Sequence, residues 1–224
     1  MAKHSKRYTA LKEKVAAGKS YSLDEALALA KVAGNTTFDA GVELHVRTGI
    51  DVKQSDEQLR GTVSLPHGTG KKQRIAALTS NPDAAKSAGA ALAGGEELIK
   101  DIQAGKMDFD VLVAEPAFMP KLAPVAKILG PRGLMPSPKN GTVSPDVTVA
   151  IGELARGKVS FKNDNTGNIH LLVGRASFDA DKLGENIRAA YDAIKAAKPA
   201  AVKGTFIKNV TLATTMGPGI PLAL

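Results

Sequence analysis

A regular alternation of apolar and polar residues between positions 38 and 50 limits the fold more than any other feature of this sequence. Successive side chains of a β-strand point to opposite faces, so the alternation predicts a long strand with one buried face. One buried and one solvated face is typical of an antiparallel sheet. The apolar set is Phe38, Ala40, Val42, Leu44, Val46 and Ile50, and the opposite set is Asp39, Glu43, His45 and Arg47.

A helix is predicted just before this strand. Ser22 and Glu25 have the spacing of a capping box, in which each side chain accepts a hydrogen bond from the backbone N–H of the other residue. Small and apolar residues follow over 26–30 as the body of the helix. The first part of the chain therefore predicts a helix followed by a strand.

The middle of the chain, from 67 to 158, has a different pattern. Continuous apolar runs at 75–78 and 111–114 each precede a segment with helical character. Short apolar strands that alternate with helices predict βαβ units, a parallel sheet and a Rossmann-like α/β fold. One helix is predicted to start at Asn81-Pro82. Two more are predicted over 118–129 and 146–156.

The end of the chain returns to the antiparallel pattern. Two apolar stretches, 159–162 and 169–173, flank a turn-rich segment and predict a hairpin. A helix is predicted over 181–197, where apolar residues recur on one face. A last strand is predicted over 205–215.

These patterns predict two domains, and the fold class is α/β and α+β combined. Residues 1–66 and 159–224 form an α+β domain with an antiparallel sheet, built from both chain ends. Residues 67–158 form the inserted Rossmann-like α/β domain. The chain would cross between the domains near 66–70 and near Gly157, where glycines favour a hinge.

Positive charge is concentrated at the N-terminus. The 224 residues carry a formal net charge of +8, and residues 1–19 hold six Lys or Arg against one acid, a net charge of +5. Basic arms bind phosphate groups, so Lys3 and Arg7 are candidate nucleic-acid contacts. The alternative is the solvated face of a first helix.

Several kinds of catalytic and metal site are excluded by the sequence. The chain has no cysteine, so thiolate nucleophiles, disulfides and zinc–cysteine sites are impossible. Gly68-Thr69-Gly70-Lys71 is not a P-loop, because Leu65 replaces the first glycine and Lys72 replaces the magnesium-binding Ser or Thr. The four histidines lack the spacing of metal ligands, and no G-x-S-x-G motif exists. We therefore predict no enzyme, no cofactor and no metal.

Two alternatives to this interpretation stay open. One is a nucleotide-dependent enzyme that uses the α/β domain, and the other is a protein-interaction scaffold with incidental positive charge. No apolar run reaches the roughly 18 residues needed to span a membrane, and no apolar segment of a secretory signal follows the basic N-terminus. We expect a cytoplasmic protein with no membrane partner.

The composition favours folded RNA over single strands as a partner. Aromatic residues make up only 4% of the chain, too few for a surface that stacks unpaired bases. The segment Thr214-Thr215-Met216-Gly217 offers two hydroxyls, a flexible apolar side chain and a glycine that allows close backbone approach. The alternative is an ordinary terminal turn.

The segment 130–139 is rich in proline and glycine and is predicted to be an ordered loop. Arg132 and Lys139 could bind phosphate there. A rigid connection between helices explains the same composition equally well.

Four stretches of the chain resemble the family of bacterial large-subunit ribosomal protein one, the proteins of the mobile side stalk beside the tRNA exit site. The likeness runs along the whole chain in the right order, and the Gly-Pro-Arg-Gly-Leu-Met-Pro motif is very specific. The stretches are 61–71, 128–136, 161–164 and 214–217.

The resemblance implies a structural ribosomal protein at the cytoplasmic ribosome, whose end-built domain binds the 23S rRNA stalk. It also implies contact with outgoing exit-site tRNA and other large-subunit components, and repression of the protein's own operon mRNA. The resemblance also implies which residues contact RNA: Phe38, Thr215, Met216 and Gly217. Gly41 departs from the usual Ser or Thr, so a hydroxyl contact would be missing.

The candidate RNA-binding residues combine the family positions with basic and polar neighbours. His170 lies on a predicted strand, where a histidine that is satisfied within the fold is common, but it is kept as a candidate. The full set is Phe38, Thr214, Thr215, Met216, Gly217, Lys208, His170, Lys3 and Arg7.

Overall fold

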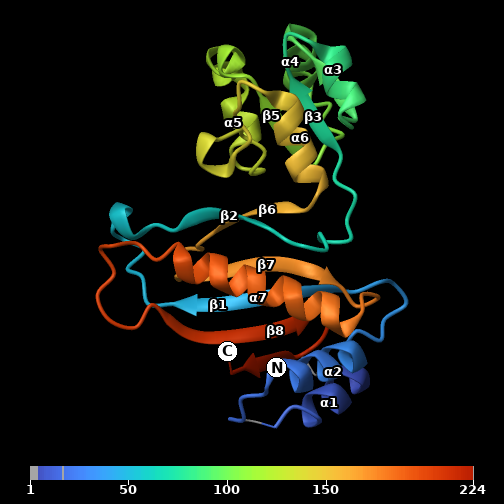
Figure 1. The fold of residues 1–224 in the computed structure, drawn as a ribbon, viewed down its shortest axis with the longest axis vertical. Coiled ribbons are helices and arrows are strands. Elements are labelled where there is room, and N and C mark those ends of the chain that lie inside the picture. Colours follow the sequence, from blue (N-terminus) through green and yellow to red (C-terminus); the bar gives the residue numbers. More distant parts are fainter. Residues whose placement is uncertain (1–4, 17, 224) are drawn as a thin grey trace. The chain divides into compact units, whose positions relative to one another are not determined.

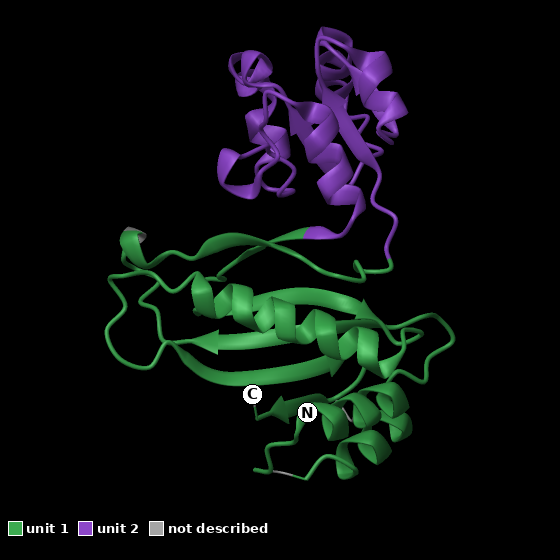
Figure 2. Ribbon diagram, viewed as in Figure 1, with its two compact units in different colours: residues 1–70, 159–224 green, residues 71–158 purple. Residues whose placement is uncertain are grey.

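The computed structural model describes residues 5–16 and 18–223, which divide into two compact units (Figure 2). One unit comprises the chain up to Gly70 and from Val159 onward, and the other is Lys71–Lys158. The first contains an antiparallel sheet and the second a separate parallel sheet. This combination confirms the predicted fold class.

The unit built from both chain ends contains a four-stranded sheet in the order β7-β1-β8-β9, whose neighbouring strands are antiparallel. Strands β2 and β6 form a separate two-stranded sheet (Figure 1). The helices of this unit are α1 (Lys6–Glu13), α2 (Leu23–Ala33) and α7 (Ala180–Ala196), and its strands are β1 (Gly41–Thr48), β2 (Arg60–Ser64), β6 (Lys158–Lys162), β7 (Asn168–Arg175), β8 (Ile207–Thr214) and β9 (Gly219–Leu222), with a 3-10 turn at Ser55–Glu57.

The core of this unit lies between one face of the sheet and helices α2 and α7. Val42, Leu44 and Val46 of β1 are buried there, as their alternation predicts. The prediction was wrong for Phe38, which lies before the start of β1 and is exposed. The other face of β1 carries His45 and Arg47, which are partly or fully exposed. The capping box at the start of α2 is present, and α7 occupies almost the whole predicted span of 181–197.

The hairpin predicted over 159–173 is only partly correct, because a single antiparallel bridge, between Asn163 and Ile169, joins its two arms. Strand β6 pairs with β2 and β7 pairs with β1, so the two strands enter different sheets. Asp164 shapes the turn between them, because its carboxylate accepts hydrogen bonds from the backbone N–H groups of Thr166 and Asn168, at 2.8 and 2.7 Å. The turn chemistry was therefore predicted correctly, but not the pairing of the flanking strands.

Strand β9 was also missed by the sequence pattern. It is the last strand of the sheet, and the carbonyl of Pro221 accepts from the N–H of Tyr21 at 3.0 Å, on the side away from β8. Proline is tolerated there because no hydrogen bond to β8 is lost. Residues 215–218 consequently form the turn between β8 and β9 rather than a turn at the end of the fold.

In the second unit, β3 is the buried central strand of a parallel sheet in the order β4-β3-β5. A hydrophobic cluster lies on each face of this sheet. The strands are β3 (Ile75–Leu78), β4 (Leu92–Gly94) and β5 (Val111–Ala114), the helices are α3 (Pro82–Ser87), α4 (Glu96–Gln103), α5 (Ala126–Leu129) and α6 (Val147–Ala155), and 3-10 segments span Pro116–Phe118, Pro120–Val125 and Pro138–Asn140.

The helix predicted over 118–129 is only partly correct. Its first part is 3-10 helix, and the α-helical segment α5 is a single turn. Pro120 and Pro124 explain the difference, because proline lacks the N–H that an α-helix requires and clashes with the preceding turn. Asn81 does precede α3, but its side chain makes no capping hydrogen bond.

Candidate RNA-binding site

A groove of about 390 Å³ opens beside the turn between β8 and β9. Phe38 and Met216 are the large apolar side chains of its lining, and they are 52% and 68% exposed. Apolar side chains of this size are normally buried, so their exposure at one groove suggests a binding surface. The lining residues are Arg7, Asn35, Thr36, Thr37, Phe38 and Met216.

Met216 is held in an unusual backbone conformation. Its φ of 64° is the only positive value for a non-glycine residue within the described part of the chain. For L-residues this left-handed region costs roughly 1–2 kcal/mol. Strained residues of this kind often occur at ligand-binding positions.

Gly217 is required by close packing beneath this turn. A Cβ atom at this position would collide with the hydroxyl of Thr214. Its backbone N–H donates to the carbonyl of Thr214 at 2.8 Å. Thr214 itself is only 4% exposed, so its place in the structure is beneath the turn and not on the exposed rim.

Thr215 joins the turn to the start of β1. Its backbone N–H donates to the carbonyl of Gly41 at 2.9 Å, and its hydroxyl accepts from the Gly41 N–H at 3.0 Å. A Cβ atom on Gly41 would lie 3.0 Å from Leu172 and 3.2 Å from the Thr215 hydroxyl. A side chain at position 41, where the family resemblance implies Ser or Thr, therefore requires Leu172 and Thr215 to move by a few tenths of an ångström.

Arg7 is the basic residue at the rim of the groove. Its guanidinium donates to the backbone carbonyl of Met216 at 2.7 Å and to that of Asn35 at 3.3 Å. It lies on α1, none of whose described residues is buried. The N-terminal basic segment therefore includes a solvated helix, and Arg7 both supports the groove and adds positive charge to it.

Polar groups of the groove also come from three residues that were not predicted from the sequence: Asn35, Thr36 and Thr37. The hydroxyl of Thr36 donates to the carbonyl of Phe38 at 2.6 Å, which fixes the short loop before β1. A run of small polar residues between a helix and a strand was the available signal.

Two other candidates lie away from the groove. Lys208 is exposed near the opposite end of β8, roughly 20 Å from the turn at about 3.3 Å per residue. His170 lies on β7, directly opposite His45 of β1. Lys3 lies outside the described residues.

The glycine-rich segment 67–70 is bound within its own unit. The backbone N–H of His67 donates to the Asn186 side chain at 3.1 Å, and that side chain donates to the carbonyl of Gly68 at 2.9 Å. Asn186 is fully buried. The backbone N–H of His67 is therefore hydrogen-bonded to α7 and is not available to a phosphate.

The loop 130–139 combines packing with exposed charge. Leu134 and Met135 pack against a hydrophobic cluster of the second unit. Arg132 and Lys139 are exposed. The two interpretations of this loop, a rigid connection and a phosphate contact, are compatible with each other.

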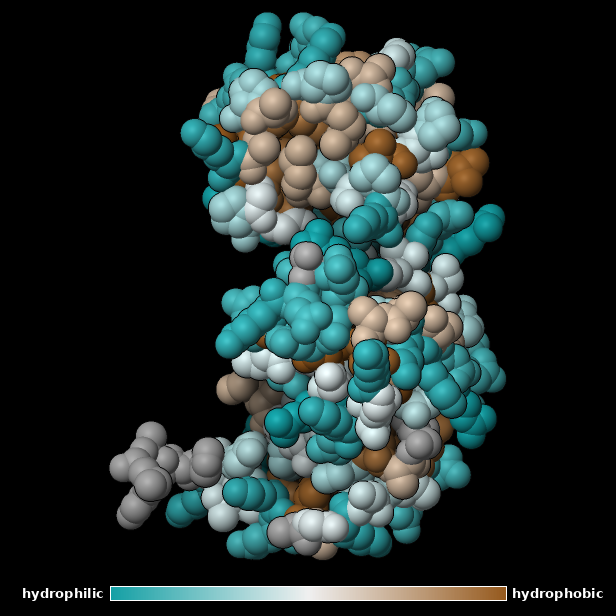
Figure 3. All heavy atoms as spheres, turned by 90° about the vertical axis from the view of Figure 1, so that its left-hand side faces the viewer, coloured by the Kyte–Doolittle hydropathy of each residue, from teal (hydrophilic) through white to brown (hydrophobic). Residues whose placement is uncertain are grey.

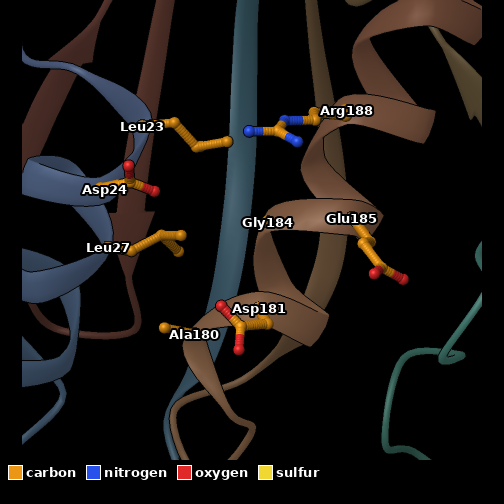
Figure 4. Close-up of a pocket in the computed structure, with 8 residues that line it drawn as sticks. All are labelled: Leu23, Asp24, Leu27, Ala180, Asp181, Gly184, Glu185 and Arg188. Carbon is orange, nitrogen blue, oxygen red and sulfur yellow. The ribbon is translucent and has the colours of Figure 1, made fainter.

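A second cleft, of about 490 Å³, lies between α2 and α7 (Figure 4). Asp24, Asp181 and Glu185 line it together with Arg188. Glu185 turns away from α2 in Figure 4, and its carboxylate lies 2.7 Å from Nε2 of His67. Because carboxylates outnumber cations here, this cleft suits a phosphate backbone poorly.

Within the described ranges, no group of three or more His, Asp or Glu side chains is placed to hold a metal ion. No helix of residues 5–16 and 18–223 is both long and apolar enough to cross a membrane. On the face drawn in Figure 3, the unit built from both ends is mainly hydrophilic.

Comparison with known proteins identifies the family. Residues 27–218 match the model of the Ribosomal protein L1p/L10e family. The large ribosomal subunit protein uL1 of Fervidobacterium nodosum is 49% identical, over 100% of this chain and 97% of the relative. Those of Thermosipho melanesiensis and Deinococcus radiodurans are 50% and 49% identical, over 98% and 100% of this chain and 96% and 97% of the relatives. The chain therefore belongs to the uL1 family of large-subunit ribosomal proteins.

Proposed function

We propose that this protein binds the 23S rRNA of the ribosomal stalk through the groove beside Phe38 and Met216. The observation that carries the proposal is the pair of exposed apolar side chains on a rim that Arg7 holds in place. Membership of a large-subunit ribosomal family places the chain at the cytoplasmic ribosome and in a family of structural proteins, not enzymes.

The chemistry of the groove fits a folded RNA. Phe38 and Met216 can pack against a ribose or the edge of a base, and Arg7 and the hydroxyls of Thr36 and Thr37 can reach phosphate or 2′-hydroxyl groups. Only one ring is exposed there, so the groove is not a platform for stacking many unpaired bases. Recognition would therefore depend on RNA shape.

The remaining candidates would extend this surface along the sheet. His170 and Lys208 lie beyond the groove on strands of the same sheet. The exposed cations of α1 would add contacts that depend on salt but not on sequence. Thr214 and Gly217 would act by shaping the turn that presents Met216.

We further propose two roles beyond ribosomal RNA. The protein would assist release of tRNA from the exit site, and it would repress its own operon by binding a similar RNA fold in the messenger. The end-built domain would carry the RNA contacts, with domain boundaries near 66 and 159. The protein itself would catalyse no reaction and use no cofactor.

The central proposal is tested by a gel shift with a stalk rRNA fragment across a salt series. Met216→Asp should weaken binding, because the new carboxylate repels phosphate at an exposed position where it does not disturb the core. Val149→Asp is the matched control, because Val149 is exposed in the other unit. Equal affinity of Met216→Asp and the wild type, or no preference of the wild type for stalk RNA over a random duplex, would refute the assignment.

A further inference from the structure

Two histidines meet on the solvent-facing side of the four-stranded sheet. His45 of β1 and His170 of β7 are direct partners in the strand register. Their Nδ1 atoms are 2.7 Å apart. Their side chains are 30% and 51% exposed, so the pair is accessible from the solvent.

The geometry indicates one hydrogen held between the two rings. Two nitrogens at 2.7 Å form a hydrogen bond only when one donates and the other accepts. The ring centroids are 4.9 Å apart. This is close to the largest centroid separation that a 2.7 Å nitrogen–nitrogen distance allows, and it is reached only when each Nδ1 points directly at the other ring. A metal on that line, with bonds of about 2.0 Å to each nitrogen, would need the nitrogens about 4 Å apart. A proton fits between them and a metal does not.

The outer nitrogens of the pair face carboxylates. Nε2 of His170 lies 3.4 Å from Asp164, and Nε2 of His45 lies 3.7 Å from Glu43. Each carboxylate favours a proton on the Nε2 atom that it faces, which leaves both Nδ1 atoms as acceptors. Two acceptors cannot bond to each other, so an additional proton between them resolves the conflict.

Asp164 keeps its negative charge over the range in which histidine titrates. Partial burial acts to raise the pKa of Asp164, but hydrogen bonds from Asn168 and Thr166 outweigh it and hold the pKa well below its usual range. The cationic form of the pair therefore has a permanent counter-charge beside His170.

A single proton is favoured over two. Burial and the facing ring of His170 lower the pKa of His45, whereas Glu43 acts to raise it. Two protonated rings in head-on contact would repel each other. Arg47 on the same strand adds one further positive charge to this face.

The described residues of β8 and β7 that neighbour the pair on this face are uncharged. Thr211 of β8 lies opposite His45, and Asn209 and Ala213 flank it at the alternate positions that share this face. On β7, Asn168 and Leu172 hold the equivalent positions on either side of His170. Among the described residues of β1, β7, β8 and the turn before β7, the charged groups on the face of the pair are Glu43, Asp164 and Arg47.

We infer that His45 and His170 take up one proton as a single group, and that RNA binding at this face is linked to that proton. The linkage rests on the proposed function, because His170 belongs to the candidate RNA surface. A nearby phosphate stabilises the protonated pair, so RNA affinity rises as the pH falls. One linked proton gives at most about a tenfold gain in affinity per pH unit.

The linkage is tested with the stalk rRNA fragment at constant ionic strength between pH 5.5 and 8. The affinity of the wild type should rise as the pH falls, and His45→Thr should reduce this gain. His67→Gln is the matched control, because His67 pairs with Glu185 of α7, away from the exposed face of the sheet. The control should keep the full gain.

The shared proton is tested in the free protein by NMR titration of the histidine ring signals. His45→Thr should move the midpoint of the His170 titration, whereas His67→Gln should not. An unchanged His170 midpoint, or equal pH dependence of RNA affinity in the wild type and His45→Thr, overturns the inference while leaving RNA binding intact. A wild type that binds no stalk RNA at any pH overturns both the linkage and the proposed function.

Discussion

Arg7 donates a hydrogen bond from Nη2 to the backbone carbonyl of Met216 at 2.7 Å, across 209 positions of sequence. The same guanidinium reaches the carbonyl of Asn35 at 3.3 Å. Asn35 lies three residues before Phe38, so the side chain of Arg7 links the segment that carries Phe38 to the turn that carries Met216. The width of the candidate RNA site is thus set by a residue that need not touch RNA itself.

Substitution of Arg7 should therefore harm RNA binding more than the loss of one charge does. Lys12 is an exposed cation on the same helix, so Lys12→Ala is the matched control. We expect Arg7→Ala to weaken binding of the stalk fragment more than the control does, by up to about 1.5–3 kcal/mol, the range for hydrogen bonds to a charged group. Equal losses in a gel shift would show that Arg7 acts only through its charge.

The strain at Met216 leads to a second prediction. Met216→Gly should raise the free energy of unfolding by up to about 1 kcal/mol, because glycine adopts a φ of 64° without steric cost. RNA affinity should fall, because the exposed side chain is lost. Chemical denaturation and gel shifts on the same protein measure the two effects. A loss of stability would mean that Met216 packs more tightly against its unit than its exposure indicates.

The elements with strong local signals were predictable from the sequence. The alternation around Leu44, the capping box at Ser22 and the apolar face of α7 each depend on residues close together in the chain, and each prediction is confirmed. The 3-10 helix at Pro120–Val125 and the edge strand β9 were not predicted, because prolines and the pairing of distant strands decide them.

The groove itself was beyond sequence reasoning. Phe38 was singled out through a family resemblance and Met216 also through the chemistry of its segment, and no local pattern brings the two together. They meet because β1 pairs with β8 in a register that places Val42 opposite Thr214. A different long-range pairing, that of β1 with β7, places His45 opposite His170, which separate inspection of the four histidines could not reveal.

Gly41 offers a test of the missing hydroxyl. A side chain here must displace Leu172 or Thr215 by a few tenths of an ångström, so Gly41→Ser and Gly41→Ala should each lower the free energy of unfolding by about 1 kcal/mol. Only the serine variant restores a hydroxyl, so it should bind the stalk fragment more tightly than the alanine variant. Identical affinities of the two variants would show that no hydroxyl contact is made at this position.

Asn186 should be essential for the stability of the unit built from both ends. It is fully buried, its amide donates to the carbonyls of Gly68 and Val173, and its oxygen accepts from the N–H of His67. Asn186→Leu preserves the approximate size but leaves these backbone groups without partners. The free energy of unfolding should fall by roughly 3 kcal/mol or more, at 1–3 kcal/mol for each unsatisfied group.

The neighbouring residue on α7 supplies the control for this prediction. Glu185→Gln weakens an exposed hydrogen-bonded contact with His67 and should cost less than about 1 kcal/mol. Urea denaturation followed by a probe in this unit measures both variants. If Asn186→Leu lowers the free energy of unfolding no more than Glu185→Gln does, water must bind the carbonyls that lose Asn186 as a donor. The segment 67–70 would then be held by the conformations of its glycines and not by α7.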